Sequence, residues 1–259
     1  MLAPKQKNSE ILEQLSVYGR KNASEFMIQR WKRQAKSLSD TDIVDSKRLL
    51  AIIAVYENDF DATNKYFDQA LFFSGNESSS VYNDYAQALI MQGRGMDALG
   101  CYFKAFTINP SVSNLENIVG LSLGLLYIDV LRDVASIATK LNINTEIYFP
   151  IINRAIDKIN RSVAFFDNIE LSLESYRAVI DLSDYIAHKK FYTQKKLSYH
   201  HLDNMFGVII HPENLTPNEV SELNDDFTES IVNLNIPYED ILKLSVYFSF
   251  YDLKDSEVA

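Results

Sequence analysis

The sequence has 259 residues but a single cysteine, Cys101, and it contains no long uninterrupted apolar run. One cysteine can form neither an intrachain disulfide nor a thiolate metal cluster. A membrane-spanning helix needs about 20 consecutive, mostly apolar residues. Residues 1–10 also lack the basic and then apolar segments of a secretion signal. We therefore expect a cytoplasmic protein that does not insert into a membrane.

Motifs of catalysis and of cofactor binding are also missing. Gly93 and Gly95 flank Arg94, but the Gly-Lys-Ser/Thr of a phosphate-binding loop does not follow. The histidines lack the spacing of a metal-binding motif, and they are His188, His200, His201 and His211. We predict no cofactor, no bound metal and no enzymatic activity, and we expect a structural role for Cys101.

Basic residues are scarce in one part of the chain. The formal net charge is −10, and residues 201–259 hold twelve Asp or Glu but only two Lys. The first two hundred residues are therefore close to neutral. This asymmetry indicates two parts with different surfaces.

What the chain does contain, from about Ser9 to Asn160, is apolar residues at steps of three and four, which is typical of consecutive amphipathic helices. The clearest repeat lies between Val81 and Pro110. Its first half carries Tyr82, Tyr85, Ala86 and Leu89, a turn at Gly93 follows, and its second half carries Ala98, Tyr102, Ala105 and Pro110. Small residues allow two antiparallel helices to approach closely, and the larger ones fill the groove between them.

This pattern resembles the tetratricopeptide repeat, in which a large–large–small set of residues on one helix meets a small–aromatic–small set on the next, and a proline ends the unit. Looser copies precede and follow it, so that the likeness covers about residues 47–141, with the first turn at Asn58 and Asp59. The resemblance implies a stack of helical hairpins whose first helices line a groove for a peptide or a partner helix.

The last sixty residues have a different pattern. Residues 206–210 and 245–251 are typical of strands, and 197–203 could add a third. Between them, Thr216, Pro217 and Glu219 form the start signal of a helix with a capping box. We predict a mainly α fold, with a tetratricopeptide-like hairpin stack in a domain of residues 1–165 and a helix plus a small acidic α+β module in residues 166–259.

The leading functional hypothesis is a protein-interaction module, such as an adaptor, chaperone or regulator, that binds a protein or peptide partner. Exposed residues of the first helix of the best repeat would line its groove, and the candidates are Asn83, Gln87 and Ile90. Type III secretion chaperones have a similar acidic tetratricopeptide core, but the α+β module departs from them. The sequence does not specify the oligomeric state.

Three alternatives stay open. An immunity or inhibitor protein would bind a basic enzyme through an acidic patch of Asp225, Asp226 and Glu229, widened by Glu219, Glu222, Glu239 and Asp240. An enzyme would have its site at the domain junction. A nucleic-acid-binding protein would bring Arg30, Lys32 and Arg33 together with Lys189, Lys190, Lys195 and Lys196, although the overall acidity argues against this.

Overall fold

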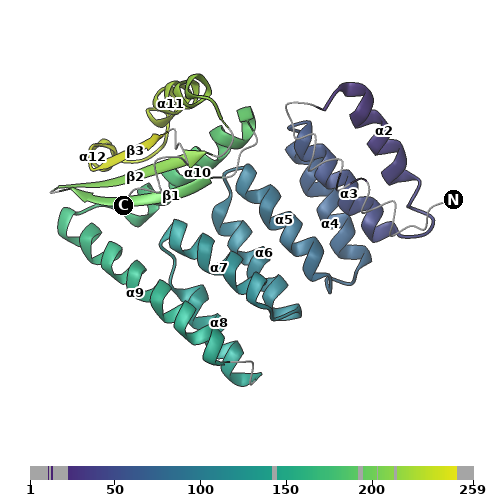
Figure 1. The fold of residues 1–259 in the computed structure, drawn as a ribbon, viewed down its shortest axis with the longest axis horizontal. Helices are drawn as coiled ribbons and strands as arrows, with labels where there is room; N and C mark the ends of the chain where they lie inside the picture. The colour runs from purple at the N-terminus through teal and green to yellow at the C-terminus, as the bar shows by residue number, and fades with distance from the viewer. Residues whose placement is uncertain are drawn as a thin grey trace, which may run out of the picture. The chain divides into compact units, whose positions relative to one another are not determined.

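The computed structural model describes residues 11, 13, 23–141, 145–191, 195–202, 204–212 and 215–249. The fold is mainly α-helical and has one small sheet near the C-terminus, as the sequence predicts (Figure 1). The chain forms two compact units, Met1–Asn117 and Ile118–Ala259. The domain division expected after residue 165 rests on the change of sequence pattern and stays a prediction.

The first unit consists of short helices with well-defined ends. They are α2 (Glu25–Lys36), α3 (Ile43–Tyr56), α4 (Phe60–Phe73), α5 (Ser79–Met91) and α6 (Gly95–Ile108), followed by the start of α7 (Val112–Leu125). The side chains that cap α2, α3, α4 and α5 each accept a backbone N–H of the first turn, and they are Ser24, Asp42, Asp59 and Ser78. Asn58 and Gly93 lie in the left-handed region, with φ of 59° and 68°, at the predicted turns.

Helices α3 and α4 pack along each other, and so do α5 and α6. The alanines of the proposed repeat lie at these contacts and are at most 2% exposed, and they include Ala54, Ala70, Ala86, Ala98 and Ala105. Small buried side chains such as these allow two packed helices to approach closely. The stack of adjacent hairpins is therefore confirmed.

Neighbouring hairpins are joined by specific contacts as well as by apolar packing. The rings of Phe67 on α4 and Tyr85 on α5 stack, with centroids 4.9 Å apart. Asn64 on α4 and Gln92 after α5 exchange two amide hydrogen bonds of 3.2 Å each. Such contacts fix the register of one hairpin on the next, since both partners must be satisfied at once.

The second unit contains the rest of α7 and three longer or more amphipathic helices, α8 (Asp129–Lys140), α9 (Thr145–Ile169) and α10 (Leu173–Phe191). The start of α10 is bonded to the end of α7. The Tyr176 hydroxyl donates to the Gly124 carbonyl oxygen at 2.8 Å, and the Arg177 guanidinium donates to the carbonyl oxygen of Leu125, also at 2.8 Å. These bonds satisfy carbonyls at the C-terminus of a helix, which lack partners within the helix itself.

The sheet has the order β1, β2, β3. Strands β1 (Lys195–Leu202) and β2 (Met205–Pro212) form an antiparallel pair, whereas β3 (Leu244–Phe248) is parallel to β2. Between β2 and β3 the chain forms α11 (Pro217–Ile231) and the short α12 (Tyr238–Leu242). The predicted strand–helix–strand order is confirmed, as is the capping box of Thr216 and Glu219. Of the predicted strand 245–251, residues 250 and 251 lie outside the described residues.

The side of β3 away from β2 is capped by a side chain. Asn224 on α11 donates from Nδ2 to the Phe248 carbonyl oxygen and accepts the Phe248 N–H at Oδ1, both at 2.8 Å. On the other side, the Ser249 N–H donates to the Ile210 carbonyl oxygen at 2.8 Å. One amide thus pairs with the backbone of Phe248 as a further strand would, which prevents strand addition at that residue.

Candidate functional site

The three residues predicted to line a groove follow one another along α5. Gln87 is exposed, but Asn83 and Ile90 are half-buried. The Asn83 amide donates to Asn114 Oδ1 at 2.8 Å, and the Gln87 amide donates to the Tyr102 hydroxyl. Both amides thus already bind groups of their own chain. Gln87 is the best placed of the three to contact a partner, because it alone is exposed. Their role in partner binding stays a prediction.

The first helix of each hairpin is joined to the first helix of the next by polar bonds. Arg48 on α3 forms an ion pair with Asp84 on α5, and Asn83 on α5 is bonded to Asn114 on α7. Burial raises the pKa of the Asp84 carboxyl, and the Arg48 guanidinium beside it partly offsets this. The polar side chains along the first helices are therefore held in place by bonds within the chain itself.

The first unit also has an exposed pair of aromatic side chains that the sequence analysis did not predict. Phe72 and Phe73, at the end of α4, are 76% and 49% exposed. They line an open pocket of about 470 Å³ together with Lys47, Asp68 and Gln69. The sequence did contain a signal for it, because the buried stripe of α4 runs through Thr63, Phe67, Ala70 and Leu71, which leaves two consecutive phenylalanines outside the apolar face.

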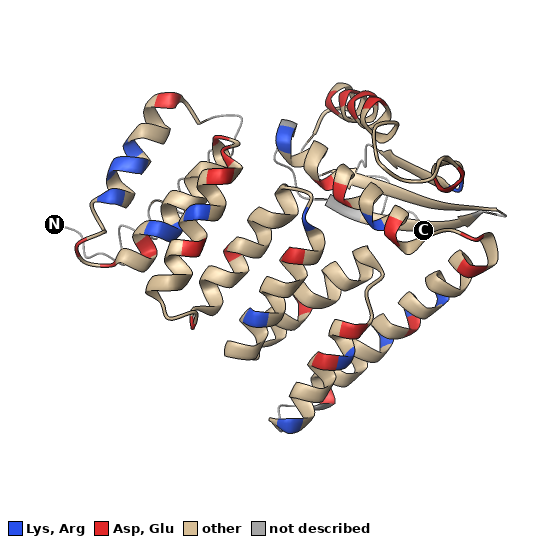
Figure 2. Ribbon diagram, turned by 180° about the vertical axis from the view of Figure 1, so that it is seen from behind, with Lys and Arg blue, Asp and Glu red and all other residues tan. Residues whose placement is uncertain are grey.

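The acidic patch of the second unit is centred on α11, which carries five acidic and no basic residues (Figure 2). Asp225 and Glu229 are exposed. Asp240, which the sequence assigned to this patch, is instead 6% exposed and accepts a 2.6 Å hydrogen bond from Ser175. That assignment was wrong, because the partner of Asp240 lies 65 residues away and no local pattern reveals it.

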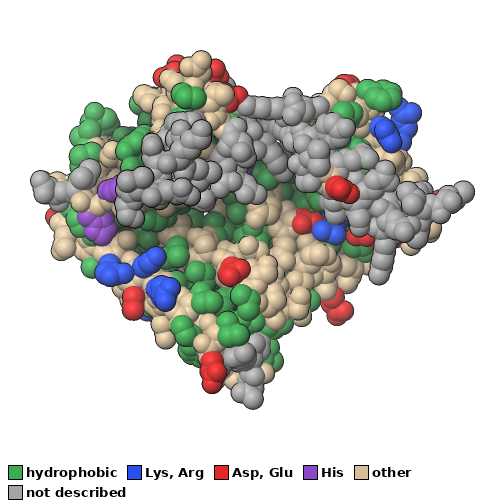
Figure 3. All heavy atoms as spheres, in the orientation of Figure 1, with side chains coloured by type: hydrophobic (Ala, Val, Ile, Leu, Met, Phe, Trp, Pro, Cys, Tyr) green, Lys and Arg blue, Asp and Glu red, His purple; other side chains and the backbone are tan. Residues whose placement is uncertain are grey.

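The basic side chains do not form one described cluster. On α2, Arg30, Arg33 and Lys36 are exposed, whereas Lys32 pairs with Glu57 at 2.5 Å. The side chains of Lys190, Lys195 and Lys196 lie outside the described part, so the convergence expected of a nucleic-acid-binding protein stays a prediction. Basic side chains also gather over α9 (Figure 3), where Arg154, Lys158 and Arg161 follow the spacing of one helix face.

The histidines lie in different surroundings. The His201 ring stacks on Phe165 with centroids 4.5 Å apart, His188 is buried on α10, and His211 lies 3.2 Å from the Ser198 hydroxyl. His200 and His201 are opposite Gly207 and Phe206 in the register, and they therefore point to opposite faces of the sheet. Within the described ranges, no group of three or more potential ligands is placed to hold a metal ion.

Cys101 on α6 is half-buried, and burial together with the nearby Asp97 raises the pKa of its thiol from 9.0 to about 11. Because only the thiolate is nucleophilic, we expect its alkylation by iodoacetamide to be roughly a hundredfold slower at neutral pH than that of the urea-unfolded chain. Above the ordinary thiol pKa, the alkylation rate of the unfolded chain no longer changes with pH. The rate of the folded protein should still rise about tenfold per pH unit there. A plateau near the ordinary thiol pKa would contradict this.

Comparison with protein-family models, with curated proteins and with solved structures finds no match to this chain. The likeness to tetratricopeptide repeats therefore rests on the residues and hairpins described above. Among the described residues, no helix combines the length and the apolar character needed to cross a bilayer.

Proposed function

We propose that the protein is a cytoplasmic interaction module that binds a segment of a partner protein on its tetratricopeptide-like hairpins, and that it acts by binding rather than by catalysis. The observation that supports this best is the exposed pair Phe72 and Phe73 beside an open pocket. Exposed aromatic side chains with a polar rim are typical of protein-binding surfaces.

The surroundings of the two rings suit an apolar side chain of a partner. Their centroids lie 5.5 Å apart in an edge-to-face arrangement, so that they offer one flat and one edge-on surface. Lys47 and Asp68, which also line the pocket, carry opposite charges, and this favours a partner segment with polar residues around its apolar contact. Gln87 on α5 would provide a separate contact with the peptide backbone.

The test is affinity capture of the tagged full chain from its own cells, with a photo-crosslinking amino acid at position 72. We expect one crosslinked partner protein, and we expect Phe72→Ala/Phe73→Ala to weaken its binding roughly tenfold or more. Gln87→Arg tests the surface of α5 in the same way. Phe26→Ala is the matched control, since Phe26 is 71% exposed on α2.

The outcomes separate the possible surfaces. Loss of the partner only with Gln87→Arg would move the binding site to α5. Equal binding by all variants, or capture of nucleic acid alone, would refute the proposal. Circular dichroism of each variant distinguishes lost binding from lost folding.

A second candidate function is favoured by the charge of α11. A helix with five acidic and no basic residues attracts a basic protein and accelerates its association, as an inhibitor or immunity protein would require. This function predicts that salt weakens the complex and that Asp225→Lys/Glu229→Lys abolishes it, while Phe72→Ala/Phe73→Ala leaves it intact.

A further inference from the structure

The sheet of the second unit has two edges that differ from each other. The edge at β3 is capped where Asn224 bonds both backbone groups of Phe248. Strand β1 forms the other edge (Figure 1), and it is longer, with eight residues against five in β3. An edge strand presents backbone N–H and C=O groups with which a further strand can pair. Strand β1 is therefore the edge at which the sheet can be extended.

The bonds between β2 and β3 show which residues of β2 face which neighbour. The Phe206 N–H donates to the Lys243 carbonyl oxygen at 2.8 Å. The Ser249 N–H donates to the Ile210 carbonyl oxygen, also at 2.8 Å. Phe206 and Ile210 thus direct their backbone groups toward β3. Because successive residues of a strand direct these groups to opposite sides, the residues between them that alternate with Val208 direct theirs toward β1.

The register carries this alternation over to β1. Ser198 and His200 lie opposite Ile209 and Gly207, so their backbone groups face β2. The neighbouring residues direct their N–H and C=O groups away from the sheet, and these outward residues are Leu197, Tyr199 and His201. In the part of the chain that the structure describes, no other strand pairs with them. The side chains of Tyr199 and His201 are exposed, so solvent reaches this strand.

The composition of β1 indicates the charge of a suitable partner strand. Its sequence KKLSYHHL has two lysines and two histidines but no acidic residue. Opposite charges on neighbouring strands stabilise a sheet, whereas like charges directly opposite each other destabilise it. A second copy of β1 would bring two more lysines to the same small sheet. An acidic strand would instead compensate the lysines that are already there.

We propose that β1 binds an extended acidic segment of a partner protein, which adds to the sheet as a further strand. The backbone of the segment would bond to the outward residues, and its acidic residues would lie opposite Lys195 and Lys196 in the register. The unpaired backbone groups require an extended partner, and the lysines determine its charge. The proposal concerns the second unit and does not depend on partner binding by the hairpins.

The test is titration of the isotopically labelled full chain with a capped heptapeptide of alternating glutamate and valine, followed by NMR. We expect saturable binding. With the peptide at about ten times its dissociation constant, amide hydrogen exchange at Leu197, Tyr199 and His201 should slow roughly tenfold. The amides of Ser198 and His200, which face β2, should change little and are the internal control. The same peptide with lysine in place of glutamate should bind roughly tenfold more weakly or worse.

Charge reversal assigns the preference to β1. Lys195→Glu/Lys196→Glu should bind the glutamate peptide roughly tenfold more weakly and the lysine peptide more tightly than the unchanged protein does. Arg154→Glu/Lys158→Glu on α9 is the matched control, since it makes the same change of charge at exposed residues of the same unit. This control should keep the preference for glutamate. Circular dichroism establishes that both variants are folded.

Four results would overturn the proposal. The first two are no saturable binding of the glutamate peptide, and binding without slower exchange at the outward residues. The third is slower exchange there when the chain alone is concentrated, which would indicate a second copy as the occupant. The fourth is an equal loss of binding in the α9 control, which would indicate attraction by overall charge. Phe72→Ala/Phe73→Ala should bind the peptide normally, so failure of this proposal and failure of the proposed function are distinguishable.

Discussion

Replacing Phe206 by alanine is expected to lower the free energy of unfolding of the second unit by about 3–5 kcal/mol. Phe206 on β2 is fully buried, and it is the centre of an aromatic cluster contributed by α9, α10 and β1. Its ring centroid lies 4.7 Å from that of Phe166, 5.4 Å from His201, 5.7 Å from Tyr176, 5.9 Å from Tyr199 and 6.2 Å from Phe165. Alanine would leave a cavity in contact with all of these rings.

The measurement is urea unfolding of the full chain, followed by the near-ultraviolet signal of the aromatic residues. Because the chain forms two compact units, the transitions of the two units have to be fitted separately. Tyr238→Ala is the matched control, since Tyr238 belongs to the same unit and is 67% exposed, and we expect a change within about 0.5 kcal/mol. A loss of less than about 1 kcal/mol for Phe206→Ala would contradict a tightly packed cluster.

The features predicted correctly from the sequence are those determined by neighbours in the chain. The hairpin turns at Asn58 and Gly93 follow from the tolerance of these residues for a left-handed backbone. The start of α11 follows from Thr216 and Glu219, whose reciprocal bonds span only three residues. Strands β2 and β3 were predicted from their β-branched and alternating residues. Strand β1 was expected as a third strand of the same sheet.

Features that depend on distant partners could not be predicted. Asp240 has the sequence context of a surface acid on a short helix, yet it is buried against Ser175. Asn83 and Gln87 have the spacing of groove residues, yet their amides bind Asn114 and Tyr102. In each case the polar residue satisfies a buried group elsewhere in the chain, and such pairs are visible only once the helices are in place.

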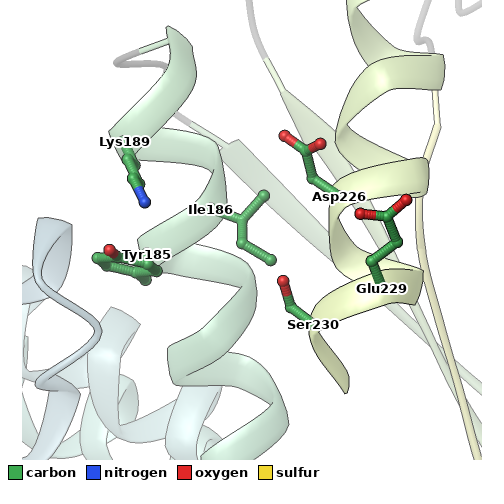
Figure 4. A pocket seen from close by; sticks show the side chains of 6 residues that line it. All are labelled: Tyr185, Ile186, Lys189, Asp226, Glu229 and Ser230. Atoms are coloured by element: carbon green, nitrogen blue, oxygen red, sulfur yellow. The ribbon is translucent and has the colours of Figure 1, made fainter. Parts of the chain in front are cut away.

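Lys189 on α10 and Asp226 and Glu229 on α11 line one pocket (Figure 4), and this arrangement illustrates the same limit. Lys189 belongs to a lysine-rich stretch, and Asp226 and Glu229 to an acidic helix, so each was interpreted with neighbours of its own charge. The structure brings the two charges into one pocket because α11 returns onto α10 before β3 begins. A crossover connection between parallel strands commonly has this effect.

The other large expected effect concerns Asn114 on α7, a polar residue that is only 4% exposed. Its Nδ2 lies 2.7 Å from the Asn109 carbonyl oxygen and 3.3 Å from the Ser79 hydroxyl oxygen, and its Oδ1 accepts the amide of Asn83. Asn114→Ala removes a partner from each of these three groups at once and leaves the space around a buried side chain unfilled. We expect it to lower the free energy of unfolding of the first unit by about 2–3 kcal/mol, measured by urea unfolding.

Aspartate at the same position distinguishes hydrogen bonding from shape, because it has nearly the same volume as asparagine but cannot donate when it is ionised. We expect Asn114→Asp to cost at least as much as Asn114→Ala near neutral pH, since its carboxylate would face the Asn109 carbonyl oxygen. The folded protein would raise the pKa of this carboxyl, so the loss relative to the unchanged protein should shrink as the pH falls toward that pKa. Asn117→Ala, on the same helix and half-exposed, is the control and should change stability by no more than about 0.5 kcal/mol. Full stability of Asn114→Asp at neutral pH would mean that Asn114 fills space and that its amide does not hold α5 and α7 together.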